Sequence, residues 1–487
     1  MKKTYLWYDY ETFGSDPRRD RISQFAGIRT DMNFKVVDEM VYYCKLAEDY
    51  LPNPEASLIT GITPQEANEK GITENELAAI LFKEFTKEGT VTVGYNSIKF
   101  DDEITRNLFY RTFRDPYERE WKNNCSRWDF MRAVLGVYVM KPELLKWPLK
   151  EDGRPSFRLE ELSEANGISH ENAHDAKSDV YATIGLAELL SRKSSVIFNY
   201  FFNLREKEFV KSELSKDELF LHIDFGYGYE KGYASLIFKI GDFSKRGDKN
   251  AFLFVDVLSD IEVIENMSSK EMKEYLYYTN ERLEEIGKKR PGLKQIRINQ
   301  SPLIIPYEGL RENPQFLKRL TVNLKEKVEK LKKLSSKRKD ELLSVFFREE
   351  DDQETDPDLD IYGSFASQWD KNEMVAFHKE NYEYVPRFKD KKYKEMYFRF
   401  LGRNMPETFT EEEKSRWKEH CYEFISKERE GFQNLSSLKI EIEELRKKHR
   451  GNIEKTRIIE DIKEYAEELE KKLKPGSVKP GKQLKMF

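Results

Sequence analysis

Apolar and polar positions near the start of the chain follow the two-residue period of a β-strand. The stretch YLWYDYETFG is rich in strand-forming residues, and two acids, Asp9 and Glu11, interrupt it one tyrosine apart. Because side chains in a strand alternate between its faces, the two acids should project together, with Tyr8 and Tyr10 on the other face. The next segment, QFAGIRTDMNFKVVDEMVYYCKL, predicts two further strands joined by the polar turn TDMNF.

Helix-start signals follow this predicted hairpin. Thr63 with Pro64 and Glu66 predicts an N-cap, a first-turn proline and a capping box, and Thr73 with Glu76 repeats the pattern before LAAILFKEF. A further strand is predicted at TVTVGYN, and helices at DDEITRNLFYRTF, SFRLEELSEANGI and HDAKSDVYATIGLAELLSRK. A hairpin followed by alternating helices and strands indicates an α/β layered domain over residues 1–195.

The pattern changes after residue 195. Residues 196–345 contain the β-like stretches LHIDFGYGYEKGYASLIFKI, NAFLFVDV and IRINQSPLIIP, with one predicted helix at SSKEMKEYLYYTNERLEEIG, which indicates a small α+β or barrel-like module. Residues 346–472 have helical spacing, and SSLKIEIEELRKKHRGNIEKTRIIEDIKEYAEELEKKL predicts two antiparallel helices with Gly451 near the break. Residues 473–487, with two Pro-Gly turns, lysines and no acid, predict a flexible basic tail.

Composition limits the class of protein. A chain of 487 residues is too long for one hydrophobic core, so about two to four domains are expected. The net charge of −5 gives no global sign of nucleic-acid binding, so an anionic partner would need a local basic groove or metal ions. Three widely spaced cysteines and no apolar run of about 20 residues predict a soluble, cytoplasmic protein without a disulfide framework.

Acidic residues supply the candidate chemistry. Two carboxylates on one face of a strand repel each other unless a proton or cation lies between them, and Mg²⁺ and Mn²⁺ prefer such ligands. Charges that protect an edge strand from aggregation are the simpler alternative. Asp101 and Asp102 follow the strand-like run TVTVGYN, and His174 precedes Asp179 by five positions. A cap or helix-dipole role alone would account for Asp102.

Taken in order, these stretches resemble the three exonuclease motifs of the DEDD superfamily, in its histidine-containing branch. Longer segments, LITGITPQEA, GYNSIKFDDEITRN, PSFRLEELSEANGI and NAHDAKSDVYATI, are similar to the bacterial exodeoxyribonuclease I family. So are INQSPLI, DIYGSFASQWD and FRFLGRNMPETFTEEEKSRW outside the catalytic domain, which extends the resemblance to about residue 470. The implied fold is an α/β ribonuclease-H-like exonuclease domain, an SH3-like α+β barrel domain and a C-terminal all-α helical domain, together clamping a single strand.

The resemblance implies a processive 3′→5′ exonuclease that degrades single-stranded DNA to 5′-mononucleotides in DNA repair and recombination. One alternative is another exonuclease of the superfamily, for RNA trimming or proofreading, although such chains are usually close to the catalytic domain in length. The other is a catalytically silent nucleic-acid-binding or clamp-associated adaptor, which would have no need of the acids and the histidine.

The resemblance also implies the site residues. Two Mg²⁺ ions, for which Mn²⁺ can substitute, would be held by Asp9, Glu11 and Asp179, with Asp9 bridging them. Asp101 would hold the second ion directly or through water and, with Glu11, belong to the catalytic residues. His174 would be the general base, since its ordinary pKa of about 6.5 suits proton transfer near neutrality.

Contacts with substrate are implied for five residues, one of which is Glu11, on the terminal sugar. Arg106, Tyr117 and Trp121 would contact DNA, and Arg158 would bind the terminal nucleotide or its phosphate. From the residues alone, arginines at helical spacing are usually solvated, which is the alternative for this stretch.

Two protein partners are implied as well, and the protein is expected to be a monomer with no membrane partner. Lys141 and Tyr200 match the pocket for the acidic, phenylalanine-ended tail of the single-strand DNA-binding protein. The end of the chain, QLKMF, resembles the peptide by which bacterial proteins dock on the sliding clamp, although so short a motif also arises by chance. Its docking residues would be Gln483, Leu484, Met486 and Phe487.

Overall fold

The computed structural model describes residues 3–169, 175–310, 323–346 and 356–475. It divides into two compact units. The first comprises Met1–Arg127, Ser169–Gly185 and Glu354–Phe487, and the second comprises Trp128–Ile168 and Leu186–Gln353. The N-terminal α/β segment therefore shares its unit with the C-terminal helices.

A mixed five-stranded sheet organises the N-terminal segment. Its strand order is β3-β2-β1-β4-β5, with β1 antiparallel to β2 and parallel to β4. The strands are β1 (Thr4–Thr12), β2 (Ile22–Thr30), β3 (Val36–Tyr43), β4 (Thr90–Gly94) and β5 (Ser126–Asp129). This confirms the predicted opening strand, the hairpin that follows it and the strand at TVTVGYN.

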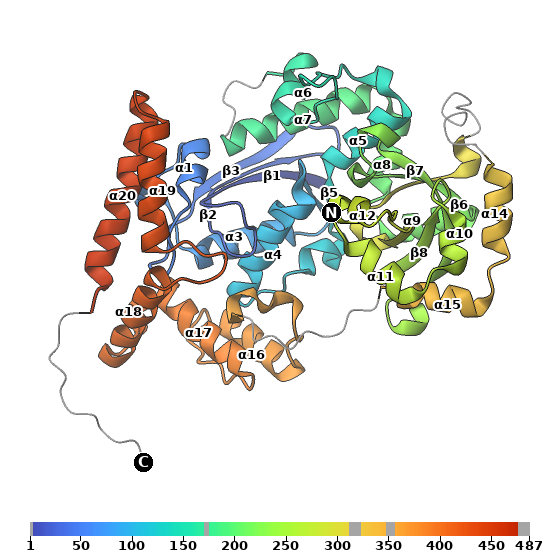
Figure 1. Ribbon diagram of the computed structural model, residues 1–487. Helices are drawn as coiled ribbons and strands as arrows, with labels where there is room; N and C mark the ends of the chain where they lie inside the picture. The colour runs from blue at the N-terminus through green and yellow to red at the C-terminus, as the bar shows by residue number, and fades with distance from the viewer. Residues whose placement is uncertain (1–2, 170–174, 311–322, 347–355, 476–487) are drawn as a thin grey trace. The chain divides into compact units, whose positions relative to one another are not determined.

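The two faces of β1 differ as the alternation predicts. Tyr8 and Tyr10 are buried in a core with Phe25 of β2 and Phe85 of α3. The same core includes residues of α3 (Glu74–Phe85) and α4 (Asp101–Arg111), which cover this face of the sheet (Figure 1). Asp9 and Glu11 are left on the opposite face.

Local capping sets where the neighbouring helices begin. Thr63 Oγ1 accepts a hydrogen bond from the backbone of Glu66 at the start of α2, and Thr73 forms a complete capping box with Glu76 at the start of α3. The other helices of this segment are α1 (Pro54–Thr60), α2 (Pro64–Lys70) and α7 (Ala176–Lys193). These caps confirm the predicted helix starts.

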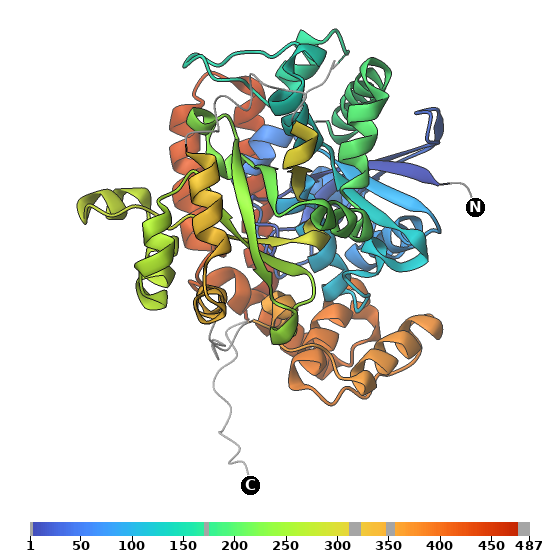
Figure 2. The same cartoon turned by 90° about the vertical axis from the view of Figure 1, so that its right-hand side faces the viewer.

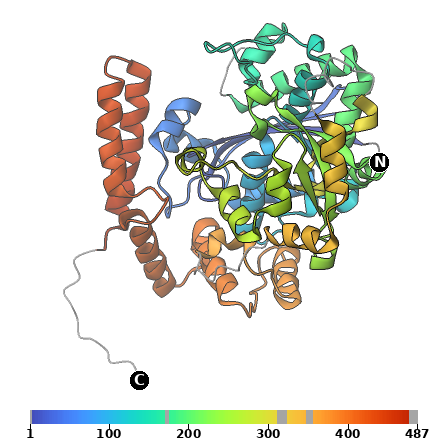
Figure 3. The same ribbon diagram turned by 45° about the vertical axis from the view of Figure 1, so that its right-hand side comes forward.

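The C-terminal helices complete the first unit. They are α16 (Gln368–Lys379), α17 (Lys391–Asn404), α18 (Glu411–Ser426), α19 (Leu435–Lys448) and α20 (Ile453–Leu473). α19 and α20 lie side by side (Figures 1 and 3). The ion pairs Lys439–Glu470 and Arg446–Glu460 show that the two helices are antiparallel. The turn between them contains Gly451 at φ 96°, which confirms the predicted helical pair.

The C-terminal helices share their core with the N-terminal segment. Leu51 is buried in one cluster with side chains of α18, α19 and α20. Phe113, just after α4, stacks on Phe388 with ring centroids 5.2 Å apart. Asp49 forms a buried ion pair with Arg403 of α17 at 2.6 Å. Both apolar packing and ion pairing therefore hold the two parts of this unit together.

An antiparallel five-stranded sheet organises the second unit. Its order is β10-β6-β7-β8-β9, and α14 packs against β7 (Figure 2). The strands are β6 (Leu219–Ile223), β7 (Ala234–Asp242), β8 (Ala251–Asp256), β9 (Leu293–Arg297) and β10 (Leu303–Pro306). The helices are α5 (Phe130–Met140), α6 (Leu159–Ala165), α8 (Ser195–Asn203), α9 (Lys207–Lys216), α10 (Ile261–Asn266), α11 (Ser269–Tyr277), α12 (Asn280–Glu285), α14 (Leu324–Lys332) and α15 (Ser336–Ser344).

The prediction of a single helix at SSKEMKEYLYYTNERLEEIG is wrong, because the segment forms two helices, α11 and α12. Tyr278 and Thr279 are both extended, and the Thr279 side chain accepts a hydrogen bond from the backbone of Arg282. A threonine whose side chain can cap a new helix competes with helix continuation, and here the cap prevails.

Predictions from the sequence also concern the cysteines and membrane-spanning segments. Cys44, Cys125 and Cys421 are buried free thiols. Among the helices that the structure describes, none combines the length and apolar composition that crossing a bilayer requires.

Candidate active site

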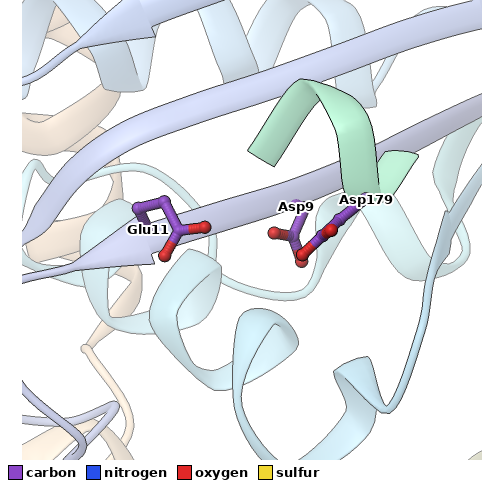
Figure 4. Close-up of side chains that lie close together, drawn as sticks. All are labelled: Asp9, Glu11 and Asp179. Atoms are coloured by element: carbon purple, nitrogen blue, oxygen red, sulfur yellow. The ribbon is translucent and has the colours of Figure 1, made fainter. Parts of the chain in front are cut away.

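Two neighbouring acids of β1 and a third acid that is far away in the sequence meet on the face of β1 opposite its tyrosines. Asp9 and Glu11 project from β1 toward Asp179, which lies in the first turn of α7 (Figure 4). One carboxylate oxygen of each lies within 4.8 Å of those of the other two. We call these three residues the carboxylate cluster.

Electrostatics oppose a full negative charge on the carboxylate cluster. Burial, followed by the charges of Asp101 and Asp179, raises the pKa of Asp9 well above its ordinary range. Burial, followed by the charges of Asp9 and Asp179, raises the pKa of Glu11 to about 9. Three carboxylates in this position therefore require protons or a cation to balance them. Oxygen donors at this spacing suit a hard divalent ion.

Of the other two predicted catalytic residues, Asp101 and His174, the structure describes only Asp101. Asp101 is the first residue of α4 and exposes only 5% of its surface. Its charge raises the pKa of Asp9, so it lies beside the carboxylate cluster, although it is not one of the three acids grouped within 4.8 Å. His174 lies outside the described residues.

Arg106, a predicted DNA contact, is paired with protein carboxylates. Its Nε and Nη2 donate to Glu120 Oε1 at 2.9 and 2.7 Å, and its Nη1 donates to Glu103. The guanidinium lies 5.2 Å from the centre of the Tyr117 ring. Only 12% of the Arg106 side chain is exposed, whereas Trp121 is 67% exposed.

The alternative that the arginines of this stretch are solvated is wrong for three of them. Arg106 is paired as described, and Arg111 forms a buried ion pair with Glu74 at 2.6 Å. Arg114 donates to Asn75 Oδ1 and to the Tyr382 hydroxyl, each at 3.0 Å. Local helical spacing indicates only Glu103, on the same helix as Arg106, because the other partners come from other elements.

Three predicted contact residues belong to the second unit. Arg158 stands at the N-cap position of α6 with an exposed side chain, 3.6 Å from Glu161. Lys141 is exposed at the end of α5, and the Tyr200 hydroxyl donates to the backbone oxygen of Ile304 at 2.8 Å. The four predicted docking residues, Gln483, Leu484, Met486 and Phe487, lie outside the described residues.

Asp102 is a buried ion-pair partner, so the interpretation of it as a cap is wrong. The N-cap of α4 is Phe100, and no side chain caps this helix end. Asp102 instead accepts hydrogen bonds from the Tyr8 hydroxyl at 2.8 Å, from Arg127 at 2.6 Å and from Arg119. The two arginines follow Asp102 by 17 and 25 residues, so no local pattern could have indicated the pairing.

Sequence reasoning also missed an aromatic groove in the first unit. A cavity of about 750 Å³ is lined by Tyr117 and Trp121 on one side and by residues of the C-terminal segment, including Phe365, on the other. Phe365 is 84% exposed. In a linear pattern such an aromatic residue cannot be told from one in a core, because exposure depends on the tertiary fold.

Comparisons with known proteins agree along the whole chain. Residues 6–187 match the exonuclease family model, 205–348 the exonuclease I SH3-like domain and 355–469 the exonuclease I C-terminal domain. Exodeoxyribonuclease I of Haemophilus influenzae is 36% identical, covering 95% of this chain and 98% of its own. That of Escherichia coli is also 36% identical, covering 96% and 98%.

Solved structures lead to the same family. Exonuclease I of Escherichia coli in complex with a dA16 oligonucleotide has a TM-score of 0.88 at 35% identity, covering 96% of this chain and 100% of that chain. The zinc-bound form of its complex with single-stranded DNA has a TM-score of 0.86 at 34% identity, with the same coverage.

These matches confirm the predicted fold class of a ribonuclease-H-like exonuclease domain, an SH3-like domain and a C-terminal helical domain. An exonuclease domain implies the use of a divalent metal ion, and the carboxylate cluster has the donors that such an ion prefers. The chain belongs to the exodeoxyribonuclease I family.

Proposed function

We propose that this protein is a processive 3′→5′ exodeoxyribonuclease that hydrolyses single-stranded DNA with Mg²⁺, releases 5′-mononucleotides and acts in DNA repair in the cytoplasm. The carboxylate cluster carries the proposal, since it occurs in a chain whose relatives are named exodeoxyribonuclease I. That exonuclease I of Escherichia coli was crystallised with dA16 and dT13 oligonucleotides and in a complex with single-stranded DNA supports the same substrate here.

Each acid has a role that its position supports. Asp9 lies between Glu11 and Asp179 in Figure 4, so it is the acid placed to bridge two ions. Asp101 lies beside the carboxylate cluster, which supports its role of holding the second ion directly or through water. A pair of Mg²⁺ ions, when bound, would supply an activated water and would neutralise charge on the attacking and leaving oxygens.

Proton transfer and substrate orientation are assigned to other side chains. His174 takes the proton of the attacking water, because its ordinary pKa suits a base near neutrality. Glu11 also contacts the terminal sugar, and Arg158 binds the terminal nucleotide. The exposed guanidinium of Arg158 supports its role in binding the terminal nucleotide.

The aromatic groove supports a path for the single strand. Trp121 and Phe365, which line the groove, expose 67 and 84% of their surfaces, and apolar side chains exposed together in this way are typical of a binding site. Bases of a single strand stack on such rings, at about 1–3 kcal/mol per base. Stacking of this kind does not depend on sequence, as degradation of any strand requires.

The proposal is tested by comparing hydrolysis of single-stranded DNA, duplex DNA and RNA, with Mg²⁺ and with a chelator. We expect hydrolysis of single-stranded DNA alone, from its 3′ end, and only with the metal. A preference for RNA or duplex DNA would favour the RNA-trimming or proofreading alternative. Absence of hydrolysis with either Mg²⁺ or Mn²⁺ would favour the adaptor.

His174→Ala is expected to lose most turnover and to keep metal and DNA binding. The loss should be about 10²- to 10⁴-fold, the usual contribution of a general base. Single-turnover hydrolysis measures the loss, while binding of a labelled oligonucleotide with Ca²⁺ serves as the control. Unchanged turnover would remove the assignment of the base.

Arg106→Gln is expected to weaken binding of single-stranded DNA and to flatten its salt dependence. A lost phosphate contact lowers the slope of log K against log salt by about 0.7. Glu120→Gln should act in the opposite direction, because Glu120 Oε1 now holds the Arg106 guanidinium. Titrations with a labelled oligonucleotide in a chelator measure both slopes, and two unchanged slopes would leave Arg106 a purely structural residue.

The partner predictions are retained as part of this proposal. Exposure of Lys141 supports a pocket for the acidic tail of the single-strand DNA-binding protein. For the sliding clamp, removal of the last five residues, QLKMF, is expected to abolish capture by the purified clamp while leaving nuclease activity unchanged. Equal recovery of the full and shortened chains in a pull-down contradicts the clamp prediction.

A further inference from the structure

The residues next to two of the proposed metal-binding acids are bonded to each other. Tyr8 precedes Asp9 on β1, and Asp102 follows Asp101 on α4. The Tyr8 hydroxyl donates to Asp102 Oδ1 at 2.8 Å, and both side chains are buried. This hydrogen bond joins the backbone segments that present Asp9 and Asp101, as does a second one between the Tyr10 hydroxyl and Thr105 Oγ1 of α4 at 3.0 Å.

Asp102 is also fixed from two further elements. Arg127 of β5 donates to its Oδ2 at 2.6 Å, and Arg119 donates to its Oδ1. Arg119 in turn donates to Thr92 Oγ1 of β4 at 3.0 Å. Asp102 exposes 1% of its surface and Arg119 none. We call Tyr8, Asp102, Arg119 and Arg127 the Asp102 network.

The start of α4 is anchored to the sheet by the Asp102 network. Its N-cap residue, Phe100, provides no side-chain hydrogen bond, so the first turn lacks the usual local anchor. Asp102 lies in that turn and is bonded to β1 and β5 instead. Any shift of Asp102 would move Asp101, the neighbouring residue in the same turn.

Stability alone is a weak explanation for the Asp102 network. Burying a carboxylate with two guanidinium groups costs desolvation that the ion pairs roughly offset, so buried salt bridges add little net stability. They do impose one geometry, because each group must meet its partners to avoid an uncompensated charge. A metal centre needs such a constraint, since changing the groups that orient its ligands typically lowers metal affinity by about 10- to 100-fold.

We propose that Asp102 is a positioning residue that holds Asp101 against the carboxylate cluster. The inference rests on the proposed function, in which Asp101 holds the second metal ion. The bond of 2.8 Å between Tyr8 and Asp102 brings together the segments that carry Asp9 and Asp101. The Asp102 network thus serves metal binding without touching metal or DNA.

Binding of Mn²⁺ to the full-length protein without DNA tests the proposal, measured by electron paramagnetic resonance. Asp102→Asn should weaken the second Mn²⁺ about 10- to 100-fold, the usual range for residues that orient metal ligands. Tyr8→Phe, which keeps the ring in the core, should weaken it less but in the same direction. In nuclease assays both variants should need more Mg²⁺ for half-maximal rate and recover at high Mg²⁺.

Asp358→Asn is the matched control. Asp358 is likewise buried and paired with two arginines, Arg399 at 3.1 Å and Arg403 at 2.6 Å, both on α17. The substitution Asp358→Asn should lower the thermal midpoint of unfolding, as Asp102→Asn does, but should leave Mn²⁺ binding unchanged. If the Asp102 and Tyr8 variants bind Mn²⁺ like the wild type, the network is structural only and the proposal is overturned.

Asp101→Asn separates the two levels of the argument. If it weakens the second Mn²⁺ while the Asp102 and Tyr8 variants do not, only the positioning role fails. If Asp101→Asn itself leaves Mn²⁺ binding unchanged, Asp101 does not serve the metal, and both the assignment in the proposed function and this inference are overturned. Should Asp102→Asn fail to fold, Tyr8→Phe decides the question alone.

Discussion

Replacing Asp9 by asparagine is expected to abolish hydrolysis of single-stranded DNA and, in the same protein, to raise the thermal midpoint of the metal-free form. Loss of activity should reach about 10³-fold or more, because the metal ions contribute several kcal/mol and each 1.4 kcal/mol is about tenfold in rate. Asp9 is the acid that lies between the other two of the carboxylate cluster (Figure 4).

The gain in stability follows from the raised pKa values. Burial and the neighbouring acids raise the pKa of Asp9 well above its unfolded value, and that of Glu11 to about 9. Between the unfolded and folded pKa values the native state holds a proton that the unfolded chain has released, so stability falls as pH rises. For Glu11 this window extends from about pH 4.5 to about pH 9. Asparagine removes one charge, which should stabilise the metal-free protein by about 1–3 kcal/mol.

Thermal unfolding in a chelator between pH 5 and pH 9 measures this effect. The wild-type midpoint should fall with rising pH, and the difference between Asp9→Asn and wild type should grow. Added Mg²⁺ should stabilise the wild type and leave the variant nearly unchanged. A metal-free midpoint equal to or below that of the wild type at pH 8 would refute the electrostatic account of the carboxylate cluster.

Local patterns were sufficient for the parts of the site that lie on one element. Alternation along β1 placed Asp9 and Glu11 on one face and Tyr8 on the other, and the capping signal at Thr73 fixed the start of α3. Such features depend only on backbone periodicity and nearest neighbours. The spacing of His174 and Asp179 gained meaning only through the resemblance to a family.

Features that join distant elements could not be predicted in the same way. Asp102 looked like an ordinary first-turn acid, since its partners Arg119 and Arg127 lie on later elements. The alternative of a solvated Arg106 is wrong for the same reason, because Glu120 lies on a later element and holds its guanidinium. Charge patterns along one helix cannot show which charges are buried, because burial depends on what packs against that helix.

The union of the C-terminal helices with the N-terminal segment is a further example. The sequence predicts residues 346–472 as a helical C-terminal domain. In the structure, Arg403 of α17 is buried and donates to Asp49 at 2.9 and 2.6 Å and to Asp358 at 2.6 Å. Asp49 is buried as well, and the charge of Arg403 keeps its pKa well below the ordinary range despite burial. This pairing ties α17 to the loop that contains Asp49.

Asp49→Ala is therefore expected to destabilise the first unit by about 3–5 kcal/mol, the usual cost of removing one partner from a buried ion pair. Arg403 would keep only Asp358 as a carboxylate partner, and its charge would remain buried without full compensation. Leu51 is close to Asp49 in the chain and packs in one cluster with side chains of α18, α19 and α20. Loss of the ion pair should therefore loosen the C-terminal helices as well. Urea-induced unfolding, followed by tryptophan fluorescence, measures the change.

The neighbouring residue provides the control. Glu48 also reaches a C-terminal helix, pairing with Lys472 of α20, but both side chains are exposed to solvent. Exposed ion pairs contribute about 0–1 kcal/mol, so Glu48→Ala should unfold almost as the wild type does. If the two variants unfold at the same urea concentration, the buried pair does not join the segments. A large difference between adjacent acids instead shows that burial, rather than the number of ion pairs, holds the C-terminal helices to the catalytic segment.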